Sequence, residues 1–382
     1  MIRIEVEEIA VVEQLAARRD DISALVDRAA RDNLPTVDPA FLVPWLHHAE
    51  RTGQAPCVLL AWRGTTLVGV VPLVRPKWRF GLGGKALQFP QLGTTPPFDV
   101  VAMPELVEEF VIAVGDFLMD RGDWDFIWLH ETPAESPASA ALRRHAAARG
   151  ARIRLRQASS YYSVPLAMPW QDFSHGLSSK FKQNLRRGWR ACQQLGDTQV
   201  LVYPDNSQCL TVAVSMMREV IDRSWKTSAH DAQELLAALV RSLGDAGKLR
   251  LSFLLVDGRP LAYLLEAVHG GRAFAIHNAY DLRHQRLSLG QLMFESAIRA
   301  AAERGDSRYE FLGNREYLGR WTAERRIFDE TMIVNARVAS RFKEWLQRQR
   351  LKHRTVKRSR LSEHKKNLSK NSFRAQEYND ID

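Results

Sequence analysis

Apolar residues in this chain recur at two spacings, and each spacing predicts a different kind of element. In the first half, side chains at helical spacing, such as Val12, Leu15 and Ile22, predict helices. These helices extend to about Arg31, from Pro104 to about Asp120, and over Ser136–Arg149. Short apolar runs bounded by turn residues predict strands over Cys57–Trp62, Leu67–Val74 and Trp124–Leu129. The turn Arg63–Thr66 makes the first two strands a hairpin.

The second half repeats this alternation of helices and strands. Its predicted helices cover Leu177–Leu195, Ser207–Ser224, Asp231–Leu243, Gln291–Arg304 and Arg341–Arg350. Its predicted strands cover Val200–Tyr203, Leu249–Val256, Pro260–Val268, Arg272–Tyr280, Tyr309–Leu312 and Ile327–Ala336. The turn Asp257-Gly258 is a strong hairpin signal between the second and third of these strands.

The two halves also share local sequence. Leu59–Val71 parallels Phe253–Leu265, and an Arg-Gly-Asp triplet follows a helix in both halves, at Arg121–Asp123 and Arg304–Asp306. Two matches in the same order indicate a duplicated unit. We therefore expect an α/β (α+β) fold of two tandem domains, each with a mixed sheet flanked by helices. The predicted boundaries are 1–165 and 166–350, followed by a basic tail, 351–382.

Composition is that of a globular chain and excludes several protein classes. Hydrophobic residues make up 45% and charged residues 26% of 382 residues, which excludes collagen-like and wholly disordered chains. No apolar run approaches the roughly 20 residues that span a bilayer, and the acidic N-terminus does not resemble a signal peptide. The three cysteines, Cys57, Cys192 and Cys209, are too few for a disulfide framework and too scattered for a metal site. We expect a cytoplasmic protein without a metal.

The net charge of +10 is concentrated in two places. The tail 351–382 holds nine Lys or Arg and four Asp or Glu, and its few large apolar side chains predict disorder. The segment Ser178–Arg190 holds five basic residues and no acid. Positive charge favours anionic partners, so the tail is a candidate contact for an anionic membrane surface or an assembly partner. The alternative for both segments is an ordinary solvated face.

The most informative segment is the connection between strand Arg272–Tyr280 and the following helix. Backbone N–H groups at a helix N-terminus bind phosphate, and Gly290 lets a ligand approach the backbone closely. Ser288 is placed to cap the helix with its hydroxyl. Positive charge comes from Arg283, His284 and Arg286. The alternative is an ordinary strand–helix connection.

This loop carries a family resemblance. Gln285–Gly290 resembles the Gln/Arg-x-x-Gly-x-Gly/Ala loop with which the GNAT superfamily of acyltransferases binds the pyrophosphate of acyl-CoA, with Ser288 at the first glycine. From about 30 to 345 the chain resembles the CelD/BcsL-like branch, a tandem-GNAT group related to FemAB-type transferases. The segments that carry this resemblance are Leu177–Arg187, Ser224–Lys226, Asn278–Asp281, Ser288–Gly290 and Phe311–Tyr317. Leu289 and Leu318 depart from the proline and lysine frequent in that branch.

The resemblance implies a set of ligand contacts in the second half. The implied acyl-CoA contacts are Tyr280, Gln285, Arg286, Leu287, Ser288, Leu289, Gly290, Gln291 and Leu292. The implied acceptor contacts, in a cleft between the domains, are Lys180, Arg186, Trp225, Lys226, Asn278 and Asp281. The first half has Thr95-Pro-Pro-Phe-Asp99 at the corresponding place, and its prolines remove backbone donors, so no second phosphate site is expected there.

Three residues are candidates for proton transfer. His277 lies on the strand before the loop and titrates near neutral pH, as a general base requires. Glu266 lies among apolar residues, where a carboxylate is costly unless paired or functional. The resemblance implies Tyr317 as the general acid that protonates the leaving thiolate. Each also has an alternative without a catalytic role. His277 would be a histidine of the core, Glu266 an outward-facing glutamate on an edge strand, and Tyr317 an aromatic residue that packs.

Three classes of function remain open. The first is an acyltransferase that moves an acyl group, acetyl above all, from acyl-CoA directly to an amine or hydroxyl of a sugar, a polysaccharide precursor or another small molecule. The second is a FemAB-like transferase that uses aminoacyl-tRNA, in which the basic segment Ser178–Arg190 would meet RNA phosphates. The third is a non-catalytic interaction protein that keeps the GNAT fold.

Overall fold

The computed structural model describes residues 3–29, 34–77, 84–90, 96–205, 209–225 and 230–337. The N-terminal half contains strands β1 (Ile4–Ile9), β2 (Gln54–Arg63), β3 (Thr66–Pro76), β4 (Ala86–Gln88), β5 (Val101–Ala102), β6 (Phe126–Pro133) and β7 (Arg152–Pro165). Its helices are α1 (Val12–Ala17), α2 (Arg19–Arg28), α3 (Pro39–Arg51), α4 (Val107–Asp120) and α5 (Pro137–Ala148), with 3-10 turns η1 (Pro35–Val37) and η2 (Pro104–Leu106).

The C-terminal half contains strands β8 (Thr198–Tyr203), β9 (Leu249–Val256), β10 (Arg259–His269), β11 (Arg272–Tyr280), β12 (Arg308–Phe311) and β13 (Arg325–Val334). Its helices are α6 (Trp170–Gly176), α7 (Ser179–Leu195), α8 (Leu210–Asp222), α9 (His230–Asp245) and α10 (Leu289–Arg304), with 3-10 turns η3 (Leu282–Leu287) and η4 (Glu316–Arg320). The predicted basic helix Arg341–Arg350 and the tail 351–382 lie outside the described residues, as does Lys226.

Within the described residues, all the strands join in one 13-stranded sheet of order β1-β2-β3-β4-β6-β13-β7-β12-β11-β10-β9-β8, with β5 beside β3. Neighbours are antiparallel except for β4–β6 and β11–β12, which are parallel. The order is palindromic: β1 to β6 in one half correspond to β8 to β12 in the other. The sequence predicts a separate sheet in each half, whereas the structure joins the two halves into one symmetric sheet.

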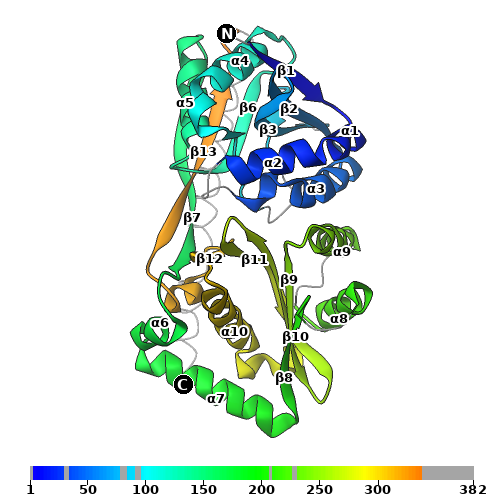
Figure 1. The fold of residues 1–382 in the computed structure, drawn as a ribbon, viewed down its shortest axis with the longest axis vertical. Helices are drawn as coiled ribbons and strands as arrows, with labels where there is room; N and C mark the ends of the chain where they lie inside the picture. Colours follow the sequence, from blue (N-terminus) through cyan, green and yellow to red (C-terminus); the bar gives the residue numbers. More distant parts are fainter. Residues whose placement is uncertain are drawn as a thin grey trace, which may run out of the picture.

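The two halves are joined because each inserts its last strand into the sheet of the other. Strand β7, from the first half, pairs with β12, while β13, from the second half, pairs with β6. The two exchanged strands then pair with each other over most of their length. They form the long vertical ribbon that links the halves in Figure 1. The predicted boundary at 165/166 therefore separates the halves in sequence but not in the sheet.

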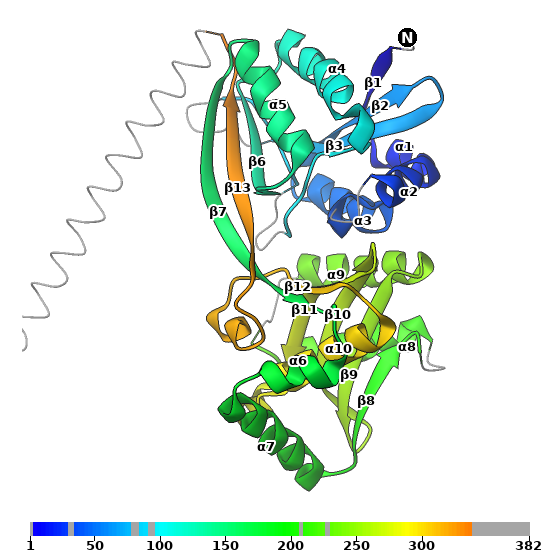
Figure 2. The same cartoon turned by 60° about the vertical axis from the view of Figure 1, so that its left-hand side comes forward.

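The helices form a layer on each face of the sheet. Helices α8 and α9 cover one face of the C-terminal strands, where Tyr263 and Leu265 are buried, and α10 covers the other, where Leu264 is buried. In the first half, α1 to α3 lie opposite α4 and α5 (Figure 2). Helix α3 packs against α9, so the two halves also meet through their helices. Fold class and layering thus match the expected mixed sheet flanked by helices.

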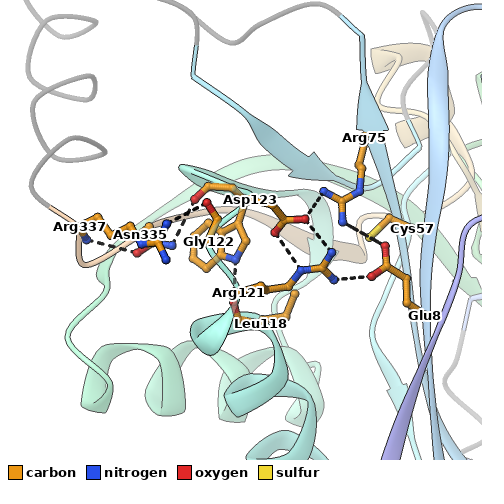
Figure 3. A network of polar contacts seen from close by, with 10 residues as sticks. Glu8, Cys57, Arg75, Leu118, Arg121, Gly122, Asp123, Asn335 and Arg337 are labelled. Carbon is orange, nitrogen blue, oxygen red and sulfur yellow. Dashed lines mark hydrogen bonds and ion pairs between the residues drawn. The ribbon is translucent and has the colours of Figure 1, made fainter.

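The two Arg-Gly-Asp triplets have the same local structure. Arg121 donates from Nε and Nη2 to the Asp123 carboxylate, at 2.9 and 2.8 Å, in the joint between α4 and β6 (Figure 3). Arg304 donates to Asp306 Oδ2 at 2.6 Å, in the corresponding joint between α10 and β12. The equivalent ion pairs support the duplication inferred from sequence. In the first half the pair extends further, because Arg121 also donates to Glu8 on β1 at 2.6 Å.

Three elements differ from the sequence-based expectation. The N-terminus begins with strand β1 rather than helix, and its acids have partners from distant strands: Trp62 Nε1 donates to Glu7 at 2.8 Å. Strand β7 lies where we expected a domain boundary. Arginines alternate along it, as in a strand with one exposed face. One of them, Arg156, pairs with Glu330 of β13 at 2.7 Å. Helix α3 was not predicted, and it contains Pro44 in its interior, where proline is unfavourable.

Candidate functional site

The parallel ladder between β11 and β12 is short. It runs from Arg272↔Arg308 to Ala275↔Phe311, whereas β11 continues to Tyr280. The last residues of β11 therefore have only β10 as a ladder partner. Opposite β10, β11 contains one extra residue between Ala275 and His277, a β-bulge that adds a local twist where the ladder with β12 ends. The divergence of two parallel strands creates backbone edges that a ligand can pair with.

The loop that follows β11 is fixed by a buried carboxylate. Asp281 is 0% exposed and accepts hydrogen bonds from the Arg283 amide and Arg283 Nε, both at 3.0 Å. Arg223, after α8, places its Nε 3.0 Å from the same carboxylate. The bonds from Arg283 hold the pKa of Asp281 below its usual value. This burial favours a structural role for Asp281 over the predicted acceptor contact.

Ser288 marks the point where the loop turns into α10. Its φ of +58° and ψ of 34° are left-handed, directly after the 3-10 turn η3. A right-handed residue followed by a left-handed one directs successive N–H groups to a common point, which is an anion-binding arrangement. The predicted side-chain cap is wrong, because the Ser288 hydroxyl makes no capping bond. Glycine adopts this left-handed conformation most readily, and Ser288 stands at the first glycine of the loop pattern that the sequence resembles.

The first backbone amides of α10 fall into two groups. Some donate to a carbonyl of the chain, and others lie at the helix start, where the helix offers no carbonyl. Gln291 and Leu292 donate their N–H groups to Ser288 O at 2.8 and 3.3 Å. The Gln291 side chain accepts from Trp321 Nε1 at 2.8 Å. Leu289 and Gly290 open the helix and have no intrahelical carbonyl to bond. Among the implied acyl-CoA contacts, the amides of Gln291 and Leu292 are therefore already bonded within the chain, whereas those of Leu289 and Gly290 lie at the start of the helix.

Gly290 has no structural reason to be glycine. Its φ lies outside the left-handed region, and a Cβ there would meet only Asn278 Nδ2, at an ordinary 3.5 Å. Glycine inside a helix costs roughly 0.5–1 kcal/mol relative to alanine. Since neither backbone conformation nor packing calls for it, the space beside Gly290 suits a group from outside the chain. This position of the loop therefore fits a closely approaching phosphate.

Positive charge surrounds this loop. Arg283, Gln285 and Arg286 are exposed on η3. Helix α7 packs against the loop so closely that a Cβ at Gly188 would lie 3.0 Å from Leu287 O. Two predicted acceptor contacts on α7, Lys180 and Arg186, are exposed. The predicted basic segment is thus a helix beside the loop.

His277 lies just beyond the end of the β11–β12 ladder, on the face covered by α8 and α9. Its Nδ1 is 2.6 Å from the hydroxyl of Tyr263 on β10, and the two rings stack at 5.8 Å. Burial raises the pKa of Tyr263 well above its usual value, so this phenol stays neutral. If Nδ1–H donates to the phenol oxygen, Nε2 is left as the basic nitrogen. The pair can therefore fix the imidazole in the tautomer that a general base needs.

Glu266 lies on the opposite face, beneath α10. It is 3% exposed, and its Oε1 has no hydrogen-bond partner. Burial raises its pKa to about 7. The predicted outward-facing alternative is wrong. The burial also separates this carboxyl from any acceptor that reaches the face of His277.

The remaining predicted residues lie at the end of the C-terminal half remote from the first half. Tyr317 on η4 is half exposed. Burial raises its pKa, and the nearby Tyr280 adds to this rise. Trp225 is 55% exposed and follows Arg223, whose carbonyl accepts from Leu282 N at 3.0 Å. Figure 1 places α7 at this same end. The predicted cleft between the halves, lined by Trp225 and α7, is therefore wrong, because both lie away from the junction.

Sequence reasoning missed two residues that contact predicted site residues. Tyr263 and Arg223 are brought to His277 and Asp281 by strand pairing and helix packing that no local motif reveals. Within the residues that the structure describes, no three His, Cys, Asp or Glu side chains gather in a way that could hold a metal ion. Among the described helices, none is long and apolar enough to cross a membrane.

Comparisons with known proteins agree with this geometry. Residues 179–320 match the family model of the acetyltransferase (GNAT) domain, which contains the loop, α7 and Tyr317. A search of curated proteins finds no match. The C-terminal half thus carries a GNAT-fold acetyltransferase domain, while membership of the CelD/BcsL-like branch stays a prediction.

Three solved structures are similar over most of the chain. FemX has a TM-score of 0.56 at 10% identity, over 85% of this chain and 96% of that one. A conserved protein of unknown function from Bacteroides thetaiotaomicron VPI-5482 has 0.53 at 13%, over 86% and 100%. The C-terminal domain of a putative lysylphosphatidylglycerol synthetase from Agrobacterium fabrum has 0.50 at 13%, over 84% and 93%. Identities this low show the fold alone.

Proposed function

We propose that this chain transfers an acyl group from acyl-CoA, acetyl-CoA above all, directly to an amine or hydroxyl of a saccharide, a polysaccharide precursor or another small molecule. One observation carries the proposal. The Ser288–Gly290 segment combines a left-handed turn, helix-initial amides and a glycine that the fold itself does not require. It opens α10 directly after the strand whose ladder with β12 ends early.

The residues present suit the pyrophosphate of such a ligand. The amides of Ser288, Leu289 and Gly290 would bind its oxygens, and exposed Arg286 would add positive charge. When bound, acyl-CoA supplies an acyl group activated as a thioester. The end of β11, near Tyr280 and Asn278, would hold the remainder of the ligand. Gln291 is not needed in this arrangement, because its side chain already accepts a hydrogen bond from Trp321.

His277 is the residue that we assign as general base. It is half-buried, lies just past the ladder end, and faces away from α10. With Nδ1 bonded to Tyr263, Nε2 would take the proton from the acceptor. Glu266 is less suited, because it is buried on the other face. Tyr317, beside Tyr280, would give a proton to the departing thiolate.

Direct transfer, without a covalent enzyme intermediate, suits the positions of the cysteines. Burial raises the pKa of Cys57 to about 12, and it lies in the N-terminal half. Cys192 is buried in α7, where burial also raises its pKa. Cys209 is exposed at the start of α8, the helix end opposite Arg223. None of the three adjoins His277 in the described structure.

Calorimetric titration with CoA tests the cofactor site. Gly290→Asp should weaken binding by at least about a hundredfold, because like charges roughly 4 Å apart repel by several kcal/mol near a surface. Gly176→Asp is the matched control on α6, since a Cβ at Gly176 meets nothing within 4 Å and a Cβ at Gly290 meets only Asn278 Nδ2 at 3.5 Å. Unchanged CoA affinity in Gly290→Asp would show that the cofactor site is wrong.

Turnover tests the base. His277→Ala should keep CoA affinity and lower kcat by roughly 10²–10⁴-fold on a confirmed acceptor, the usual share of a general base. The FemAB-like alternative is separated by thermal melting: stabilisation by aminoacyl-tRNA and not by CoA would favour it. Stabilisation by neither would favour a non-catalytic protein.

A further inference from the structure

The C-terminal half ends in a surface that combines positive charge with exposed apolar side chains. We define this basic end surface by the outer side of α7, the turn η3, and the neighbouring residues Trp225 and Leu282. Its exposed cations are Lys180, Arg186, Arg187, Arg190 and Arg286. Among the described residues none of these five has an acidic partner, so their charge is not neutralised locally.

The parts of this surface belong together in space. Helix α7 contacts η3 at Gly188 and Leu287, and η3 contacts the segment after α8 through the bond from Leu282 N to Arg223 O, at 3.0 Å. Figures 1 and 2 both show α7 lying across the end of the molecule, away from the first half. Its outer side therefore faces away from the rest of the protein.

The outer side of α7 takes no part in packing the helix against the protein. The helix buries Phe181, Leu185, Gly188 and Cys192, and Trp189 is bonded to Glu295 of α10 at 2.7 Å. The side opposite these residues carries Gln183, Arg186, Arg190 and Gln193, and the helix contains no acid. Two exposed acids, Asp197 and Asp257, lie only beyond its C-terminal end. The positive charge is thus confined to the helix and to η3.

Large apolar side chains are exposed at the same end. Trp225 is 55% and Leu282 39% exposed, and the backbone bond to Arg223 makes them neighbours. Leu195, the last residue of α7, is 48% exposed. Tryptophan and leucine beside lysine and arginine are the residues that peripheral proteins place at a bilayer interface. Exposed leucines have no comparable partner on a nucleic acid, whose contacts are phosphates and base faces.

We propose that the basic end surface docks the protein on an anionic lipid bilayer. The cations would lie near the headgroups, while Trp225 and Leu282 would enter the interfacial layer. Each basic side chain near an anionic membrane is worth about 1 kcal/mol, or roughly a fivefold change in partitioning. Docking would place the loop at Ser288–Gly290 close to the membrane surface. The inference does not depend on the proposed acyl transfer, because binding is measured without substrate.

Co-sedimentation of the full chain with lipid vesicles tests the proposal. The wild type should bind vesicles of phosphatidylcholine and phosphatidylglycerol in equal parts and not vesicles of phosphatidylcholine alone. Arg186→Gln/Arg190→Gln should lower the partition coefficient about 25-fold, from two fivefold factors. The matched control is Arg19→Gln/Arg28→Gln on α2, which removes the same charge from exposed positions in the first half and should bind like wild type.

Each contrary outcome is decisive. If both double variants bind equally well, another part of the chain, such as the basic tail, carries the binding and the proposal is overturned. If the α7 variant loses affinity for unfractionated tRNA in an anisotropy assay but keeps vesicle binding, the surface recognises RNA instead. Leu282→Ser should bind more weakly than wild type at high salt, where charge is screened. No difference there would remove the apolar part of the proposal.

Discussion

The buried carboxyl of Glu266 allows a prediction about stability and pH that separates folding from catalysis. Glu266→Gln keeps the size and shape of the side chain and removes its titration. The wild-type group has a pKa of about 7 in the folded protein, against 4.5 for an ordinary glutamate, because burial disfavours its charged form. An acid with a raised folded pKa binds its proton more tightly when folded, so its contribution to stability falls as pH rises between these two values.

The size of the effect follows from the shift. One pKa unit corresponds to 1.36 kcal/mol, so the wild type should lose about 3 kcal/mol relative to Glu266→Gln between pH 4.5 and pH 7. Below pH 4.5 the carboxyl is protonated in both states and adds no slope. Above pH 7 it is ionised in both, and the difference stays constant. The unpartnered Oε1 is consistent with a charge that the surroundings do not compensate.

Urea unfolding of both proteins across pH 4 to 8, followed by tryptophan fluorescence, measures the difference. Other titrating groups, such as Asp99, are present in both proteins and cancel in the comparison. We expect turnover of Glu266→Gln to stay within about threefold of wild type, because His277 is the assigned base. Two results together would refute the reasoning: the free energies of unfolding of both proteins change equally with pH, and Glu266→Gln loses turnover 10²-fold or more. Glu266 would then be the general base.

Three further predictions concern other buried groups. Tyr263→Phe removes the hydroxyl bonded to His277, so kcat should fall about fivefold with KM unchanged, as expected for one neutral hydrogen bond; an unchanged kcat would mean that the bond does not orient the base. Asp99 accepts three hydrogen bonds on Oδ1, and burial raises its pKa to about 6. Asp99→Asn should therefore abolish a fall of about 3 kcal/mol in stability between pH 3.8 and 6, measured by urea unfolding. Glu310→Gln leaves Arg272 buried without its carboxylate and should cost about 3–5 kcal/mol, seen as a lower urea midpoint; a neutral result would show that the pair is compensated elsewhere.

Local chemistry made part of the fold predictable. The hairpin at Asp257-Gly258 has φ values of 49° and 73°, the left-handed pair that this dipeptide favours. The helix predicted over Leu177–Leu195 begins at Ser179, where the Ser178 hydroxyl accepts from Phe181 N at 3.3 Å. In both cases the signal lies within a few residues of the structure that it specifies. The duplicated Arg-Gly-Asp joints were detectable for the same reason.

Structure that depends on distant partners was not predictable. Nothing in the sequence of β7 or β13 says that each pairs with the other half, because the period of a strand specifies its faces and not its neighbours. The candidate site shows the same division. The loop at Ser288 was visible as a motif, but its left-handed turn, the Tyr263 partner of His277 and the burial of Glu266 follow from tertiary packing.

The exchange of β7 and β13 has a consequence for the history of the molecule. During synthesis the first half emerges from the ribosome before β13 has been made. Strand β6 therefore lacks its neighbour until the second half has been synthesised. Deleting either half by a genetic event would leave the survivor with an open strand edge, which invites aggregation. Loss of either copy would therefore be disfavoured, because both copies build the shared sheet. A duplicated unit joined in this way is free to lose its own chemistry, but it cannot be discarded.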